Sequence, residues 1–134
     1  MKYRATVIAG KGRGKRIGFP TLNIRIPRTF PYTHGIYAGW TYLQEKKYPT
    51  AFHFGPIPTF GETGVSLEGF LIDADLTRTP DVVEFELVEF IREIRTFPNA
   101  DDLVAQITKD VAETKQLLQI KNRLDGHRDG EKQR

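Results

Sequence analysis

The chain has 134 residues and no cysteine, which suits one domain and excludes a disulfide framework, a thiolate zinc site and a cysteine nucleophile. Its net charge is +3, and no apolar run approaches the roughly 18 residues of a membrane span. The N-terminus lacks the apolar core of a secretory signal, so we expect a soluble, cytoplasmic protein without a membrane partner.

The charged residues are unevenly distributed along the chain. Residues 1–44 hold eight basic and no acidic side chains, whereas residues 62–93 hold nine acidic ones. A purely basic third suits a phosphate group on a nucleotide, a nucleic acid or a lipid. The alternative is that these residues are ordinary solvated charges on the protein surface.

Alternating hydrophobicity predicts strands at 3–9, 35–43, 48–54, 66–73 and 82–94, with a polar turn at 44–47. In the last strand, Val83, Phe85 and Leu87 share one face. The parity shifts near residues 88–91, which indicates a bulge or the start of a second face. Clusters of Gly, Pro, Asn and Thr separate the segments, and the pattern predicts a small antiparallel barrel or sandwich.

One amphipathic helix is predicted from about residue 100 to residue 120. Asn99 suits the N-cap, and Asp101 and Asp102 suit the positive end of the helix dipole. The apolar positions that follow helical spacing are Val104, Ile107, Val111 and Leu118. We therefore expect a domain over residues 1–120 and a disordered polar tail over residues 121–134.

Glycines and cations alternate in a loop near the N-terminus. The loop contains Gly10, Lys11, Gly12, Arg13, Gly14 and Lys15. Glycine lets backbone N–H groups approach an anion closely, and the cations add a favourable field. The loop matches neither the Walker nor the dinucleotide-binding pattern, so the hypothesis is a flap over phosphates, and the alternative is a flexible basic loop.

Thr21 and Asn23 follow this loop directly. Side chains two residues apart in an extended segment point to the same side. Both offer hard oxygen ligands of the kind that Mg²⁺ takes together with phosphates and waters. The alternative is that they satisfy backbone groups in a turn beside Pro20.

Glu68 lies within an apolar strand and shares a face with Ser66, Phe70 and Ile72. Desolvation by such neighbours raises the pKa of a carboxyl group, which suits a general base. The alternative is a charge on an edge strand that faces water. The three histidines show no metal-ligand spacing, and we assign none of them a catalytic role.

In their order along the chain, these segments resemble the riboflavin kinase family over about residues 3–118. The segments that carry the resemblance are the Gly/Arg loop, Gly18-Phe19-Pro20-Thr21-Leu22-Asn23-Ile24, Gly35-Ile36-Tyr37, Pro58-Thr59-Phe60, Leu67-Glu68, Leu71-Ile72-Asp73, and Phe97 leading to Asp110. The resemblance implies a mainly β fold, a six-stranded antiparallel Greek-key barrel with a C-terminal helix. It also implies transfer of the ATP γ-phosphate to the ribityl 5′-hydroxyl of riboflavin, which yields FMN and ADP.

The resemblance also implies roles for single residues. Thr21 and Asn23 would hold Mg²⁺, or Mn²⁺ or Zn²⁺ in its place, and the ATP phosphates. Gly10 to Lys15 would cover the phosphates, and Glu68 would accept the proton of the flavin hydroxyl. The residues that would contact the flavin are Glu68, Arg92, Arg95 and Phe97. We expect a monomer that does not bind nucleic acid.

The sequence departs from the family pattern at Phe70, where a histidine is common, and in the short segment from Arg95 to Phe97. A non-catalytic barrel that binds flavin or nucleotide is therefore an alternative. A nucleic-acid-binding barrel, suggested by the basic N-terminal third, is another alternative.

Overall fold

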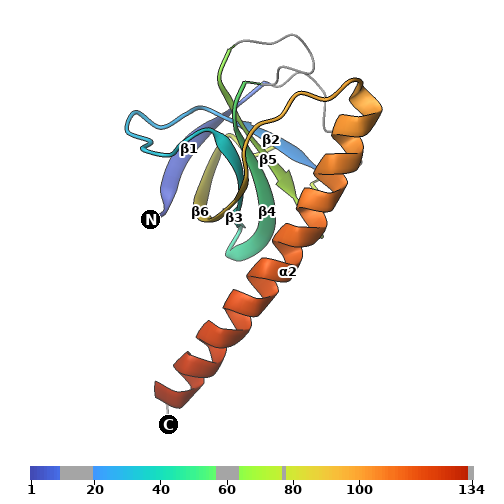
Figure 1. Cartoon of the computed structure of the whole chain (residues 1–134). Helices are drawn as coiled ribbons and strands as arrows, with labels where there is room; N and C mark the ends of the chain where they lie inside the picture. The colour runs from blue at the N-terminus through green and yellow to red at the C-terminus, as the bar shows by residue number, and fades with distance from the viewer. Residues whose placement is uncertain (10–19, 57–63, 77, 133–134) are drawn as a thin grey trace.

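Six antiparallel strands close into a barrel flanked by one long helix (Figure 1). The computed structural model describes residues 1–9, 20–56, 64–76 and 78–132, with side chains described as far as residue 121. The elements are β1 (Tyr3–Ile8), β2 (Thr21–Ile24), β3 (Gly35–Leu43), β4 (Lys46–Gly55), β5 (Ser66–Leu71), β6 (Val82–Arg92) and α2 (Ala100–Lys132). The strand order is β1-β2-β5-β4-β3-β6, and β6 closes on β1. Because β3, β4 and β5 are consecutive and β6 returns beside β3, the predicted Greek-key barrel is confirmed.

Alternate residues of the strands fill the barrel interior. The buried interior cluster consists of Leu22, Ile24, Tyr37, Phe52, Phe54, Leu67, Leu71, Val83, Phe85 and Leu87. The face predicted for β6 therefore points inward. Beyond it, the register against β3 shifts twice, so that Val88 and Ile91 lie opposite no residue of β3. The predicted change of parity thus corresponds to two bulge-like irregularities.

A two-residue turn joins β3 to β4. Gln44 and Glu45 have φ angles of 48° and 68°, and Leu43 pairs with Lys46. Two consecutive positive φ angles are typical of the type I′ turn, whose twist matches that of the flanking strands. The predicted polar turn is confirmed, and its two central residues alone form the connection.

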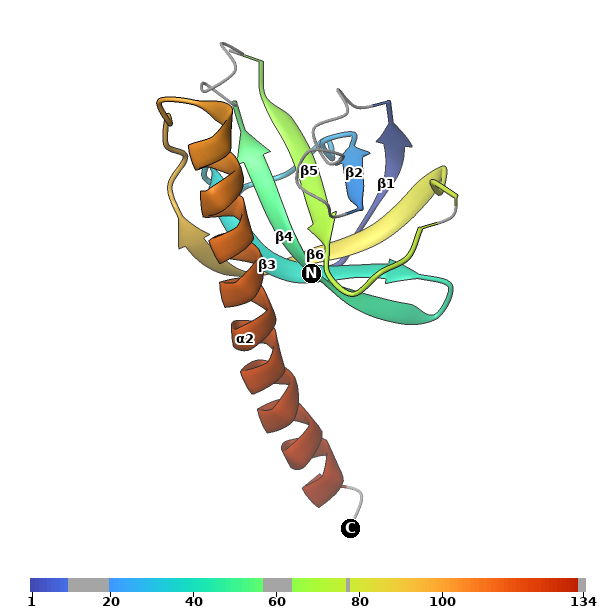
Figure 2. The same ribbon diagram turned by 90° about the vertical axis from the view of Figure 1, so that its right-hand side faces the viewer.

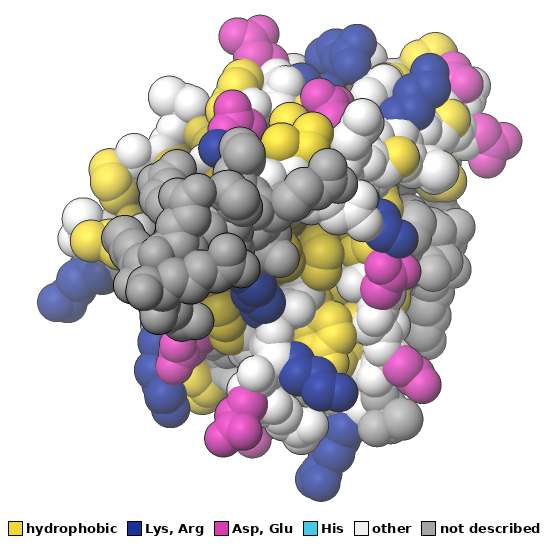
Figure 3. Space-filling view, turned by 90° about the horizontal axis from the view of Figure 1, so that it is seen from below, with side chains coloured by type: hydrophobic (Ala, Val, Ile, Leu, Met, Phe, Trp, Pro, Cys, Tyr) yellow, Lys and Arg dark blue, Asp and Glu magenta, His cyan; other side chains and the backbone are white. Residues whose placement is uncertain are grey.

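The basic start and the acidic middle of the sequence are neighbours in the fold. β1 pairs with β6, and Arg4 lies opposite Glu84 with 3.9 Å between Nη1 and Oε1. On the face in Figure 3, the described Lys and Arg side chains are interspersed with Asp and Glu. Four of the eight N-terminal cations fall within residues 10–19, outside the described residues.

The helix α2 begins as predicted. The Asp102 N–H donates to Asn99 Oδ1 at 2.8 Å, so Asn99 caps the helix. The helix packs on the outside of the barrel through a second buried cluster of Ala51, Phe70, Ile72, Ile107 and Val111. None of the helical segments in the described part of the chain combines the length and the hydropathy of a membrane span.

The helix is longer than predicted. The sequence predicts an end near residue 120, but the helix continues to Lys132 and extends beyond the barrel (Figures 1 and 2). Adding a residue to an existing helix fixes only that residue, so polar sequence can prolong a helix that packing has already nucleated. The division into a domain and a disordered tail remains a prediction.

The interior has no room for a side chain at Gly39. A Cβ at this position would lie 2.1 Å from the Glu86 carbonyl oxygen and 2.9 Å from Phe52 Cε2. We expect Gly39→Ala to lower the free energy of unfolding by about 2–3 kcal/mol, because the backbone of β6 must shift. Gly64→Ala is the control, since nothing lies within 4 Å of its Cβ. Urea denaturation measures both, and equal stability of the two variants would contradict this packing.

Candidate functional site

The outer face of the barrel brings Thr21, Asn23 and Glu68 together. β2 pairs with β5, with Thr21 opposite Phe70 and Asn23 opposite Glu68. Leu22 and Ile24 point into the barrel, so Thr21 and Asn23 point outward. The predicted common side of Thr21 and Asn23 is therefore confirmed, and Glu68 shares that side.

Glu68 is buried although it lies on the outer face. Only 2% of its surface is exposed, and Phe70, two residues along the same strand, belongs to the apolar cluster beneath α2. β5 pairs with β2 on one side and β4 on the other, so Glu68 lies on an inner strand of the sheet. Glu68 is thus not a charge on an edge strand that faces water. Its burial agrees with the other interpretation, a desolvated carboxyl group.

Cross-strand pairing continues from Glu68 in both directions. His53 on β4 lies opposite Glu68, Ile36 on β3 lies opposite His53, and Arg92 on β6 lies opposite Ile36. We call the five residues Asn23, Glu68, His53, Ile36 and Arg92 the transverse row. Neighbouring strands lie about 4.8 Å apart, so the row spans roughly 20 Å along the barrel surface.

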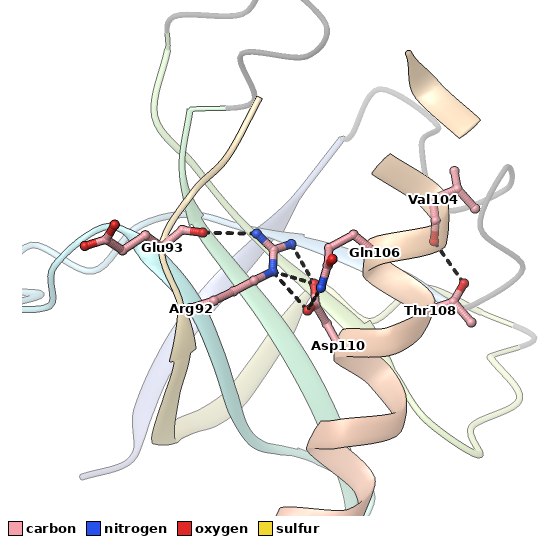
Figure 4. Close-up of polar contacts among 6 residues, drawn as sticks. All are labelled: Arg92, Glu93, Val104, Gln106, Thr108 and Asp110. Carbon is pink, nitrogen blue, oxygen red and sulfur yellow. Dashed lines mark hydrogen bonds and ion pairs between the residues drawn. The ribbon is translucent and has the colours of Figure 1, made fainter. Parts of the chain in front are cut away.

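Arg92 ends the transverse row in a buried ion pair with α2 (Figure 4). Its Nε donates to Asp110 Oδ1 at 2.9 Å, and its Nη2 donates to Oδ2 at 2.6 Å. Gln106 Nε2 donates to the same carboxylate at 3.0 Å. The Asp110 side chain is 2% exposed and that of Arg92 is 13% exposed. This contact joins the end of β6 to the helix.

Two further predicted flavin contacts lie beside Arg92. The ring of Phe97 has the Arg92 guanidinium carbon 5.9 Å and the Arg95 guanidinium carbon 5.8 Å from its centre, within range of cation–π attraction. The structure therefore groups Arg92, Arg95 and Phe97 at one end of the transverse row. Their contact with a flavin remains a prediction.

Thr21 and Asn23 are half-buried and present neutral side-chain oxygens on this face. No group of three or more His, Asp or Glu that would suit a metal occurs among the described residues. A cation here would rely on Thr21, Asn23, phosphate oxygens and water, a set of hard ligands that fits Mg²⁺ better than Zn²⁺.

The predicted phosphate flap lies outside the described residues, which applies to Gly10, Lys11, Gly12, Arg13, Gly14 and Lys15. The described residues that flank this segment adjoin the site. Ile8 pairs with Asn23, and the Pro20 carbonyl accepts a hydrogen bond from the Leu71 N–H at 2.9 Å. The role of the flap remains a prediction.

Two tyrosines elsewhere on the barrel have altered acidity. Burial and a hydrogen bond donated to the Glu86 carboxylate raise the pKa of Tyr42. Burial, with a smaller contribution from Tyr3, raises the pKa of Tyr32 to about 12. Both phenols stay protonated at neutral pH, so neither is a base under those conditions.

The position of His53 beside Glu68 was not predicted from the sequence. Nothing in the sequence near His53 points to Glu68, because the pairing joins residues on different strands. The local signal was the alternation within 48–54, which places His53 on the face opposite to Phe52 and Phe54.

Comparison with known proteins finds a family and relatives that this chain resembles. A family model described as riboflavin kinase matches residues 1–118. The bifunctional riboflavin kinase/FMN adenylyltransferase of Haemophilus influenzae is 36% identical over 110 residues, which are 81% of this chain and 36% of that protein. The RNA-binding riboflavin kinase of Bacillus subtilis is 30% identical over 108 residues, 80% of this chain and 46% of that protein. The chain thus spans about a third to a half of the length of these relatives.

Solved structures share the fold. A chain described as a macrolide-efflux protein from Streptococcus pneumoniae has a TM-score of 0.72 at 28% identity, over 85% of this chain and 38% of that one. The riboflavin kinase of Trypanosoma brucei has a TM-score of 0.61 at 23% identity, over 88% of this chain and 79% of that one. At this identity, the second likeness supports the fold alone.

The Arg92–Asp110 pair generates a stability prediction. Asp110→Asn leaves the Arg92 guanidinium without its charged partner in a buried position, so we expect a loss of about 3 kcal/mol in the free energy of unfolding. Lys115→Ala is the matched control, because it removes a pair with Asp73 whose side chains are 44% and 66% exposed. That loss should stay below about 1 kcal/mol. Similar losses in urea denaturation would contradict an anchoring role for Asp110.

Proposed function

This chain belongs to the riboflavin kinase family, and we propose that it transfers the γ-phosphoryl group of ATP to the ribityl 5′-hydroxyl of riboflavin, giving FMN and ADP. The observation that supports this most is the pairing of Asn23 with Glu68. In this pairing, a carboxylate that could accept the proton of a hydroxyl lies beside oxygen ligands that suit a phosphate-bound cation. Phosphoryl transfer depends mainly on such positioning and charge neutralisation.

Thr21 and Asn23 are the residues that would hold Mg²⁺. When bound, the cation neutralises charge on the phosphate oxygens of ATP. The Thr21 hydroxyl and the Asn23 amide oxygen orient the phosphate end of the nucleotide toward Glu68. The half-buried position of both side chains limits the water around them.

Glu68 is the proposed general base. The 5′-hydroxyl oxygen forms a bond to the γ-phosphorus, and the bond from that phosphorus to the β,γ-bridging oxygen breaks. ADP leaves with the electron pair of that bond, and the hydroxyl proton passes to the Glu68 carboxylate. Glu68 is 2% exposed, so bulk water is largely excluded from the carboxylate that would accept this proton.

The test of this function is incubation of the purified chain with riboflavin, ATP and Mg²⁺, followed by chromatography for FMN. Formation of FMN that requires all three supports the kinase. Binding of flavin without FMN would reject the kinase in favour of the non-catalytic barrel. For nucleic acid, oligonucleotide binding with a steep salt dependence would be the distinguishing result.

Replacement of the base gives the first functional prediction. Glu68→Gln keeps the size of the side chain but accepts no proton, so turnover should fall by about 10²- to 10⁴-fold. Glu84→Gln is the control, because it changes a carboxylate on the same outer face whose side chain is 46% exposed and pairs with Arg4. FMN formation by both variants is measured at saturating ATP. Near-normal turnover in Glu68→Gln would remove Glu68 from the mechanism.

Replacement of a proposed cation ligand gives the second functional prediction. Thr21→Ala removes one hydroxyl oxygen from the phosphate side of Glu68, so the KM for Mg²⁺·ATP should rise by about 10-fold while riboflavin binding stays within about 2-fold. Flavin fluorescence measures the second quantity independently of turnover. A larger effect on riboflavin than on nucleotide would reject the assignment of Thr21 to the phosphate side.

A further inference from the structure

The transverse row gives the proposed site a direction. Asn23 lies at the phosphate end, Glu68 lies next to it, and Arg92 with Phe97 lies at the other end. An acceptor whose reacting hydroxyl meets Glu68 and whose ring lies near Phe97 must extend its chain along the row. That chain passes over the positions between Glu68 and Arg92, which are His53 and Ile36.

His53 differs from its neighbours on this path. Ile36 is apolar and 5% exposed, so it offers no hydrogen bond. His53 is half-buried, with its Nδ1 shielded from solvent, and lies directly opposite Glu68 on the next strand. Directly opposed side chains have Cβ atoms about 5 Å apart, so a group at Glu68 is within reach of the imidazole.

We propose that His53 hydrogen-bonds a hydroxyl of the acceptor chain next to the one that reacts, an inference that rests on the proposed function. Because Nδ1 is shielded, the contact would be made by Nε2, which donates or accepts a hydrogen bond according to the tautomer of the neutral imidazole. The residue thereby selects acceptors with a hydroxylated chain and sets the distance of the terminal hydroxyl from Glu68. A site that pairs with a substrate hydroxyl discriminates against an analogue that lacks it.

The experiment compares two flavins on two proteins. One ligand is riboflavin, and the other is its analogue with a 5-hydroxypentyl chain, which keeps the terminal hydroxyl and lacks the other three. Binding is measured by flavin fluorescence for the wild type and for His53→Ala. We expect His53→Ala to weaken riboflavin binding by about 3- to 10-fold and to leave binding of the analogue unchanged, because one neutral hydrogen bond is lost. The KM for ATP should not change.

Two further variants separate binding from folding. His53→Gln retains a donor and an acceptor and should recover most of the riboflavin affinity. His34→Ala is the control, because it removes an exposed histidine that lies outside the transverse row and contacts the Phe54 ring at 5.1 Å. Circular dichroism checks that each variant is folded. A loss of equal size for both flavins, or no loss for either, would overturn the role of His53.

The outcomes also separate this inference from the proposed function. If the wild type binds riboflavin but forms no FMN, the kinase proposal fails. The comparison of the two flavins still decides whether His53 contacts a hydroxyl of the ribityl group. If FMN forms and His53→Ala changes the affinity for both flavins equally, the kinase proposal stands and the inference about His53 fails. If neither flavin binds the wild type, both are rejected.

Discussion

The register of β5 between β2 and β4 is the constraint on which the site depends. It places Glu68 opposite Asn23 on one side and opposite His53 on the other. Leu67 and Leu71 are fixed in the barrel interior, so a slip by one residue would turn them outward and Glu68 inward. The cost of exposing the apolar core therefore also maintains the geometry of the polar outer face.

The helix α2 completes this face. It covers Ala51 and Phe70, which lie in the row next to the transverse row, and it receives Arg92 through Asp110. A buried ion pair contributes little net stability, but loss of one partner is costly, so the pair mainly specifies where the helix docks. The same contact fixes the start of the segment that carries Arg95 and Phe97. Packing, polar contacts and the candidate flavin end of the site thus depend on one another.

Local patterns predicted the local features well. The inward face of β6, its parity change, the turn at Gln44 and Glu45, and the Asn99 cap each depend on residues within a few positions of one another. The common side of Thr21 and Asn23 followed from strand geometry. The pairing of β2 with β5 joins residues 43 or more positions apart, and no local pattern in the sequence predicts it. The neighbours His53 and Glu68 and the pair Arg92 and Asp110 required the folded chain, because strand register and helix docking decide them. The predicted C-terminal end of the helix was wrong, because composition does not indicate how far a helix continues once it has been nucleated.

The proposed phosphoryl transfer occurs at the Asn23 end of the transverse row. Paramagnetic broadening of backbone amide signals by Mn²⁺ with ADP tests it most directly, with Mg²⁺ and ADP as the diamagnetic reference. The prediction is strong broadening at Thr21 and Asn23, weaker broadening at Glu68 and His53, and little at Arg92, following the order of the strands. Broadening centred elsewhere, for example on Tyr42 and Glu86, would contradict the assignment of the nucleotide to this face.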